Sequence, residues 1–142
     1  MNRISLDQAN AMIDAAFAEG AKLGLKPLTV TIHDPGGHLI AMQRQDGASI
    51  LRGKLAAGKA CGALSLGVSS RTVGEMALDR PHFIAAVDAM GEGGMVPAAG
   101  GLIACDAQGT VQGAIGVTGD TSDNDELCAL AGIAAAGLRP LN

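Results

Sequence analysis

Aromatic residues are almost absent from this chain of 142 residues. It contains no tryptophan or tyrosine, and its two phenylalanines are Phe17 and Phe83. Proteins that bind single-stranded nucleic acids stack the bases on aromatic side chains and hold the phosphates on a basic face. This chain has a formal net charge of -4 and therefore lacks both features. The composition predicts no nucleic-acid partner.

Long apolar segments are absent as well. A helix that crosses a bilayer needs roughly 18–20 apolar residues in a row, and no run in this chain reaches that length. The segment MNRISLDQ at the start contains no continuous apolar stretch of the kind that a secretory signal requires. We therefore expect a cytoplasmic protein without a membrane partner.

Motifs for common metal and nucleotide sites are also missing. Cys61, Cys105 and Cys128 form no Cys-x-x-Cys pair, so we interpret them as small buried side chains in a reducing compartment. The chain has no His-Glu-x-x-His and no cluster of cysteine with histidine, so no zinc motif supports a metal site. The glycine-rich segment 91–101 has neither Gly-x-Gly-x-x-Gly nor a following Lys-Ser or Lys-Thr, so it is not a known nucleotide loop.

Glycine and aliphatic residues dominate what is present. The 21 glycines indicate sharp turns and close approaches of the backbone. Hydrophobic residues make up 48% of the chain, which is enough for one core of ordinary size. We predict a single domain that covers residues 1–142.

The pattern of apolar residues predicts the element order α-ββ-ααα-ββ-α. Ser5 and Gln8 form a capping box at the start of an amphipathic helix that Gly24 ends. Alternating β-branched residues predict strands 28–33 and 38–44, joined by the turn Asp-Pro-Gly-Gly. The other predicted elements are helices 48–66, 69–78, 81–91 and 122–136 and strands 102–106 and 110–118. Because both strand pairs are hairpins, the predicted fold class is α+β, an antiparallel sheet with helices packed against it.

Three segments of this sequence resemble one known family. The first is VTIHDPGGHLIAMQRQDGA at 30–48, the second KLAAGKA at 54–60, and the third GGLIACDAQGTVQGAIGVTGDTSDNDE at 100–126. They are similar to the first hairpin, the lysine-containing helix and the most specific signature of the GlcG/HbpS family. These proteins are also called heme-binding or heme-degrading-like, and the C-terminal domain of PduO-type cobalamin adenosyltransferases belongs with them.

The resemblance implies a compact domain with an antiparallel sheet of about five strands that assembles into homo-oligomers. Some members of the family bind heme, and others are encoded beside catabolic enzymes. Heme is therefore the candidate cofactor and a small molecule the expected ligand, with a catabolic accessory role as one expectation. The resemblance does not imply a particular reaction, because a shared fold does not transfer function.

Histidine and basic residues near the first hairpin are candidates for the site. His33 and His38 flank the four-residue turn, where an imidazole could ligate heme iron or act as a general base, or where both rings could be solvated. The basic candidates Arg44, Arg52, Lys54 and Lys59 follow. Arg52 and Lys59 are seven residues apart and share one helix face, where they could hold a carboxylate or a heme propionate, or form surface salt bridges.

Acidic residues crowd the start of the last predicted helix. Asp123 and Glu126 have the spacing of a capping box, and Asp125 or Glu126 could instead bind a ligand or act as a catalytic carboxylate. The pattern fails the EF-hand spacing. Gly100 and Gly101 could line a pocket with backbone amides or allow close packing.

Two main functional hypotheses follow. The first is a small-ligand-binding protein, with heme or a small anionic metabolite in a pocket between the first hairpin, the Lys59 helix and the glycine-rich loop. The second is a catabolic enzyme that performs acid–base chemistry on a small carboxylic or oxo-acid. A third reading is a structural subunit of a partner complex. The catalytic candidates are His33, Lys59 and Glu126, and the ligand-binding candidates are His38, Arg44, Arg52, Asp125, Gly100 and Gly101.

Overall fold

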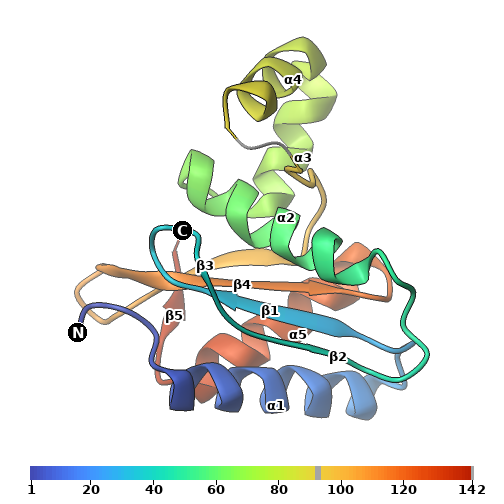
Figure 1. The fold of residues 1–142 in the computed structure, drawn as a ribbon, viewed down its shortest axis with the longest axis vertical. Helices are drawn as coiled ribbons and strands as arrows, with labels where there is room; N and C mark the ends of the chain where they lie inside the picture. Colours follow the sequence, from blue (N-terminus) through green and yellow to red (C-terminus); the bar gives the residue numbers. More distant parts are fainter. Residues whose placement is uncertain (92–93, 142) are drawn as a thin grey trace.

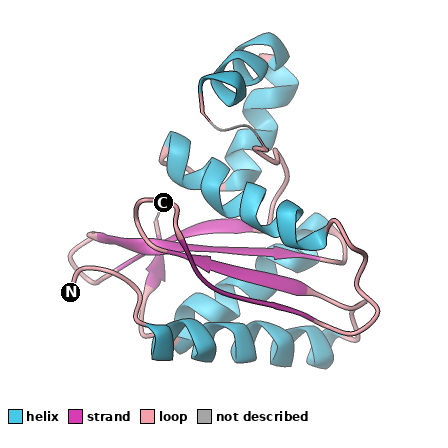
Figure 2. Cartoon of the chain, in the orientation of Figure 1, coloured by secondary structure: helices cyan, strands magenta, loops and turns pink. Residues whose placement is uncertain are grey.

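The computed structural model describes residues 1–91 and 94–141. This part of the chain forms five helices and five strands. Figures 1 and 2 show how they are arranged. The helices are α1 (Leu6–Leu23), α2 (Arg52–Leu66), α3 (Ser70–Asp79), α4 (Pro81–Met90) and α5 (Ser122–Ala135), and the strands are β1 (Thr29–His33), β2 (Leu39–Arg44), β3 (Gly101–Cys105), β4 (Val111–Thr118) and β5 (Arg139–Pro140). Among the described residues, no helix combines the length and the apolar character that crossing a membrane requires.

The strands form one antiparallel sheet in the order β2-β1-β4-β3-β5. The two hairpins join through β1 and β4, where Thr29 lies opposite Thr118 and His33 opposite Ala114. Both central strands are almost completely buried. The sheet is therefore antiparallel with five strands, and the predicted α+β class is confirmed.

The two faces of the sheet carry different side chains. Val30 and Ile32 of β1 belong to the apolar core that lies between the sheet and the helices α1 and α5. Because side chains alternate along a strand, Thr29, Thr31 and His33 point to the opposite face, where α2 lies. In Figure 1, α1 and α5 cover one face of the sheet and α2 covers the other. The second face therefore carries polar side chains under a helix.

Helix α2 lies unusually close to the sheet because glycines face it. A Cβ atom at Gly116 of β4 would collide with the backbone carbonyl of Ala56, and one at Gly101 of β3 would collide with the backbone of Lys59. These contacts are between backbones, so neither side could yield without a shift of the helix. Gly101 and Gly116 therefore set how close the backbone of Lys59 lies to the sheet.

Helices α3 and α4 form an arm that extends beyond α2, away from the sheet (Figure 1). Residues 94–100 return from this arm across α2, and the backbone N–H of Val96 donates to the carbonyl of Gly58 at 3.2 Å. A Cβ atom at Gly58 would collide with the carbonyl of Gly94, and one at Gly62 would meet the side chain of Met95. Because Gly58 and Gly62 have no side chains, the segment that returns from the arm can pack directly against α2.

Most predicted elements are observed within one or two residues. The Ser5–Gln8 capping box and the left-handed Gly24 at the end of α1 are both confirmed. Helix α2 begins at Arg52 instead of residue 48, because residues 50–51 form a turn and no side chain, that of Ser49 included, caps the helix. Part of the predicted loop, residues 92–93, lies outside the described residues.

One strand was not expected from the periodicity. Pro140 was predicted as a stop signal after the last helix, yet it lies in β5, opposite Ala104 of β3. The backbone N–H of Leu141 donates to the carbonyl of Ile103 at 2.9 Å, so the pairing continues past the proline. Proline is tolerated there because β5 is an edge strand, and a two-residue strand is too short to show a period.

Candidate functional site

A cavity of about 790 Å³ lies between the β1–β2 turn, α2 and α4. Its size falls within the range of small-molecule and cofactor sites. The turn contributes Pro35, Gly36, Gly37 and His38; α2 contributes Lys54, Ala57, Gly58, Cys61, Gly62, Leu64 and Ser65; and the arm and the segment after it contribute Val87, Asp88, Met90, Gly91, Gly94 and Met95. The cavity therefore combines apolar side chains and bare backbone with a few polar groups.

One face of α2 forms the inner wall of this cavity. Lys54 and Cys61 are seven residues apart, which is close to two helical turns, so both lie on the same face. Gly58 and Gly62 lie between and beside them and leave room for the cavity and for the returning segment. The wall therefore carries one ammonium group and one thiol.

His38 lies at the rim and is held by Asp34. Its Nδ1 is 3.2 Å from Asp34 Oδ1, and the same oxygen accepts the backbone N–H groups of Gly36 and His38. The backbone N–H of His38 is the main cause of a lowered pKa for the Asp34 carboxyl group. With Nδ1–H donated to this carboxylate, the lone pair of the His38 imidazole is on Nε2. The side chain of His38 is 82% exposed, so it is accessible to a ligand.

His33 lies buried beneath the same turn. Its Nδ1 is 3.1 Å from the carbonyl oxygen of Gly37 and 3.7 Å from Cys61 Sγ. A carbonyl can only accept, so Nδ1 carries the proton and Nε2 is a bare acceptor. Within the described part of the chain, Nε2 has no hydrogen-bond partner. Burial lowers the pKa of His33, so the ring is neutral at neutral pH.

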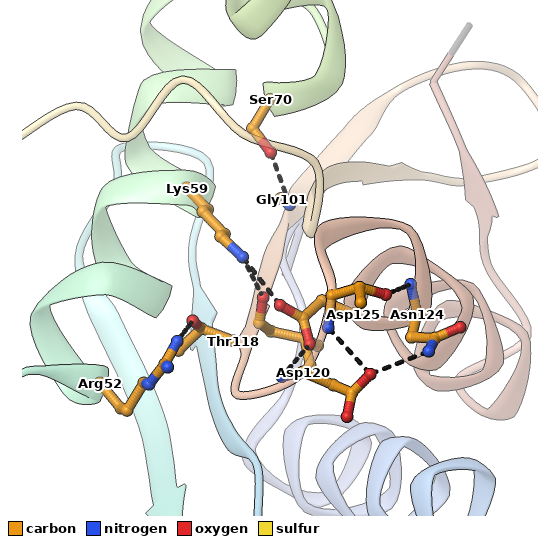
Figure 3. Close-up of polar contacts among 10 residues, drawn as sticks. Arg52, Lys59, Ser70, Gly101, Thr118, Asp120, Asn124 and Asp125 are labelled. Atoms are coloured by element: carbon orange, nitrogen blue, oxygen red, sulfur yellow. Dashed lines mark hydrogen bonds and ion pairs between the residues drawn. The ribbon is translucent and has the colours of Figure 1, made fainter. Parts of the chain in front are cut away.

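Lys59 lies on a different side of α2 and does not line the cavity. Figure 3 shows its ammonium group pointing to β4 and α5, where Nζ is 3.0 Å from the carbonyl oxygen of Val117 and 3.1 Å from Asp125 Oδ2. Both side chains of this ion pair are at least 95% buried. Burial lowers the pKa of Lys59, and the charge of Asp125 offsets part of that effect.

Other candidates surround this ion pair. Asp125 Oδ1 accepts the backbone N–H of Asp120 at 2.9 Å, and the Arg52 guanidinium donates to Thr118 Oγ1 at 2.8 Å (Figure 3). Gly100 lies directly beside the Lys59 side chain, and a Cβ atom there would collide with the Val117 carbonyl. The Gly101 N–H donates to Ser70 Oγ at 2.7 Å. These contacts join α2, α3, β3, β4 and α5, so the cluster connects elements from both faces of the sheet.

Glu126 lies in an exposed cluster around Arg71 of α3. The Arg71 side chain donates to Asp123 and to both oxygens of Glu126, and these carboxylates raise the pKa of the guanidinium. The predicted capping role of Asp123 and Glu126 is wrong, because Thr121 caps α5 and its Oγ1 accepts the N–H of Asn124 at 3.2 Å. Arg71 comes from a distant segment, so local spacing could not indicate this pairing.

Arg44 lies at the far end of β2, away from His38. It lines a second cleft of about 620 Å³ between the end of α1 and the exit of the first hairpin, together with Lys26 and Asp46. No hydrogen bond or ion pair among the described residues joins His33, Lys59 and Glu126. The structure thus brings Lys59, Asp125, Gly100 and Gly101 together in one cluster, and places His38 in another.

Sequence reasoning missed several residues of the cavity. Lys54 was considered with the other basic residues of its helix but was not assigned a ligand-binding role, and Cys61 was not considered for the site. Their spacing of seven on a helix rich in small residues could have paired them. Asp88 and Met90 come from α4, which no sequence pattern placed at the site, whereas Met95 lies in the glycine-rich segment that was expected to line the pocket. The interpretation of Cys61 as a buried residue is wrong, because it is partly exposed in the wall.

Comparison with known proteins supports the fold directly. The structure of HbpS is 27% identical to this chain, with a TM-score of 0.80 over 94% of this chain and 90% of HbpS. A PduOC:heme complex is 21% identical, with a TM-score of 0.85 over 99% of both chains. Klebsiella pneumoniae protein ORFY is 23% identical, with a TM-score of 0.84 over 96% of this chain and 92% of that protein. A comparison with curated protein sequences gives no match.

Fold and site together define a small α+β domain in which helices cover both faces of an antiparallel sheet and a ligand-sized cavity opens beside one helix. The family model described as "Haem degrading protein HbpS-like" matches residues 4–134. This chain therefore belongs to the HbpS-like family, as the three sequence segments indicated.

Loss of one partner of the Lys59–Asp125 ion pair should strongly destabilise the protein. Asp125→Asn leaves the Lys59 ammonium buried without a counter-charge, and we expect the free energy of unfolding to fall by about 3–5 kcal/mol. Arg71→Ala, which breaks an exposed cluster, should cost about 1 kcal/mol or less. Urea denaturation measures both changes, and equal losses in the two variants would contradict the role given to the buried pair.

The buried His33 should make stability depend on pH in the mildly acidic range. Its pKa is lowered in the folded state, so the unfolded chain binds the proton first and stability falls as pH decreases below about 6.5. The slope contributed by one such group is at most about 1.4 kcal/mol per pH unit. Urea denaturation between pH 7 and pH 5 should show a smaller decrease for His33→Gln, with His82→Gln as the exposed control. An unchanged slope in His33→Gln would refute this assignment.

Proposed function

We propose that this protein binds a small anionic ligand in the cavity between the β1–β2 turn, α2 and α4, with heme as the candidate. One observation carries the proposal: the His38 imidazole lies at the rim of a ligand-sized cavity and is oriented by the Asp34 carboxylate. The description of the family and the PduOC:heme complex with a similar fold support heme as the ligand.

The donor groups of the cavity fit heme. A histidine that ligates a metal usually donates its other ring N–H to a carboxylate or carbonyl, as His38 does toward Asp34. Lys54 supplies a positive charge for a propionate, and Met90 and Met95 supply apolar surface for a porphyrin. Bound heme would supply an iron centre for ligand binding or electron transfer. The protein would orient the His38 ring, neutralise a propionate and exclude water from one side.

The positions of the catalytic candidates give the enzyme hypothesis less support. Lys59 is engaged by Asp125, and Glu126 is engaged by Arg71. General acid–base chemistry needs the acid and the base within hydrogen-bond reach of one substrate. His33, Lys59 and Glu126 are instead divided among three separate environments, so ligand binding is the function that the geometry supports best.

Assembly into a homo-oligomer is the second part of this proposal. The edge surface, which we define as Leu39, Met42, Ile50 and Leu51, gathers exposed apolar residues on β2 and the segment before α2. Leu39 and Met42 lie on the edge strand β2 and are 58% and 46% exposed, and exposed apolar groups on an edge strand commonly mark a contact with another chain. A second copy of this chain is the occupant that fits the homo-oligomers implied by the family.

Hemin titration tests the ligand. The purified protein should shift the Soret band of hemin and saturate at one heme per chain, and His38→Ala should abolish the shift. Asp34→Asn should retain His38 as the iron ligand but weaken the affinity for hemin about 10–100-fold, because the carboxylate that accepts the His38 Nδ1–H is lost. His82→Ala is the control and should bind as the unchanged protein does. Binding that survives His38→Ala would overturn the proposed ligand.

Light scattering after size-exclusion chromatography tests the assembly. The particle mass should be a multiple of 14.1 kDa, and the double variant Met42→Glu/Leu51→Glu should reduce it to one chain. Two charges on the edge surface cannot be buried without a large desolvation cost. Leu78→Glu on the arm serves as the control and should leave the assembly intact. A monomer in the unchanged protein would count against the proposal.

A further inference from the structure

The β1–β2 turn contains two adjacent glycines, Gly36 and Gly37, and both line the cavity. The backbone N–H of Gly37 donates to the carbonyl of Asp34 at 2.9 Å and closes the turn. Gly37 has a φ of 85°, a left-handed conformation that other residues rarely adopt. The φ of Gly36 is not positive, so the backbone there is open to residues that carry a side chain. Backbone conformation therefore explains the glycine at position 37 but not the one at position 36.

The imidazole of His38 occupies the space that a side chain at position 36 would need. A Cβ atom at Gly36 would lie 2.9 Å from Cε1 and 3.0 Å from Nδ1 of His38, and 3.4 Å from Asp34 Oδ1. Both ring distances are shorter than ordinary van der Waals contact, which begins at 3.4 Å. The added carbon atom would thus lie beside the contact that joins the ring to the carboxylate.

The contact between His38 and Asp34 has no slack to accommodate that carbon atom. The ring would have to retreat by about 0.4–0.5 Å to restore ordinary contact. His38 Nδ1 is already 3.2 Å from Asp34 Oδ1, at the outer end of the range of about 2.7–3.2 Å for an N–H···O hydrogen bond. Because the His38 side chain is 82% exposed, the ring can turn into solvent at little cost to the fold. A side chain at position 36 would therefore separate the ring from the carboxylate without unfolding the chain.

Asp34 decides which nitrogen of the His38 ring carries the proton. The carboxylate can only accept, so it keeps the proton of the neutral ring on Nδ1 and the lone pair on Nε2. A ring that is released into water exchanges between both tautomers, and Nε2 then carries the proton for part of the time. A metal centre with an open coordination position needs the bare nitrogen.

We infer that Gly36 is a positioning residue of the cavity: because it has no Cβ atom, the His38 ring folds back onto Asp34 and its Nε2 lone pair stays available to a metal centre. The consequence for the ligand rests on the proposed function, in which heme supplies that centre. The position of the ring itself does not depend on heme.

A side chain at position 36 has a second possible effect, because Gly36 lines the cavity and a larger residue could obstruct the ligand directly. The two effects differ in their relation to Asp34. Positioning acts through the contact between Asp34 and His38, so it disappears once that contact has already been removed. Obstruction persists whether or not the contact is present.

Nitrogen-15 NMR of the folded full chain without heme tests the position of the ring. At a pH where the imidazoles are neutral, His38 should show the Nδ1–H tautomer in the unchanged protein and more of the Nε2–H tautomer in Gly36→Ala. His82 is the internal reference and should not change. Gly53→Ala is the matched control, because Gly53 also lacks a positive φ and a Cβ atom there would meet only Met42 Cε at 3.8 Å. An unchanged His38 tautomer in Gly36→Ala would overturn the inference.

Urea denaturation separates positioning from a requirement of the backbone. Gly36→Ala should unfold at a urea concentration no lower than the unchanged protein does, because alanine fits a compatible φ and restricts the unfolded chain. A clear decrease in the midpoint, absent from Gly53→Ala, would show that the fold itself requires glycine at position 36 and would refute the assigned role.

Hemin titration of single and double variants separates positioning from obstruction. Asp34→Asn and Gly36→Ala should each weaken hemin binding about 10–100-fold, because both disturb the same partner of the ring. The double variant should bind no more weakly than the weaker of the two single variants. Losses that multiply in the double variant would show obstruction and contradict positioning. If the unchanged protein does not bind hemin, the proposed function fails, and the tautomer of His38 still decides the role of Gly36.

Discussion

The buried ion pair between Lys59 and Asp125 is the interaction on which the rest of the structure depends. It joins α2 on one face of the sheet to α5 on the other, and its third partner is the Val117 carbonyl of the central strand β4. A buried charge without its partner is costly, so α2 has one stable position relative to the sheet. Gly101 and Gly116 permit the close approach that this position requires. The cavity wall is the outer side of the same helix, so its geometry follows from the inner contacts.

Helix α2 thus has two chemically different sides. The inner side carries Lys59 and meets the glycines of the sheet, whereas the cavity side carries Lys54 and Cys61. Residues five apart on a helix differ by about 140° in direction, which places Lys54 and Lys59 on different sides. One short helix therefore buries one lysine against the sheet and places another in the wall of the cavity. The cavity is completed by the turn that holds His38 and by the arm, two segments far apart in the sequence.

Local features of the fold could be predicted because their causes are local. The capping box of α1, the glycine that ends it and the Asp-Pro-Gly-Gly turn depend on residues a few positions apart. The site was only partly predictable. The hairpin, the Lys59 helix and the glycine-rich segment were correctly expected near one another, but Lys59 was expected inside the pocket. The direction of the Lys59 side chain depends on which side of α2 packs against the sheet. The sequence does not decide this, because small residues occur on both the Lys54 side and the Lys59 side of the helix. The cap at Thr121 was missed because Asp123 and Glu126 fit the same local pattern, and only the distant Arg71 engages them.

The sequence by itself determined the α+β class, the antiparallel hairpins and membership in the HbpS-like family. These follow from the periodicity of apolar residues, from turn residues and from extended motifs, all of which depend on residues close together in the sequence. Tertiary structure alone decided that Lys59 forms a buried ion pair with Asp125, that Cys61 and Lys54 share a wall, and that His33 is buried while His38 is exposed. The physical reason is that the charge, burial and reactivity of a side chain depend on groups brought near it from distant segments.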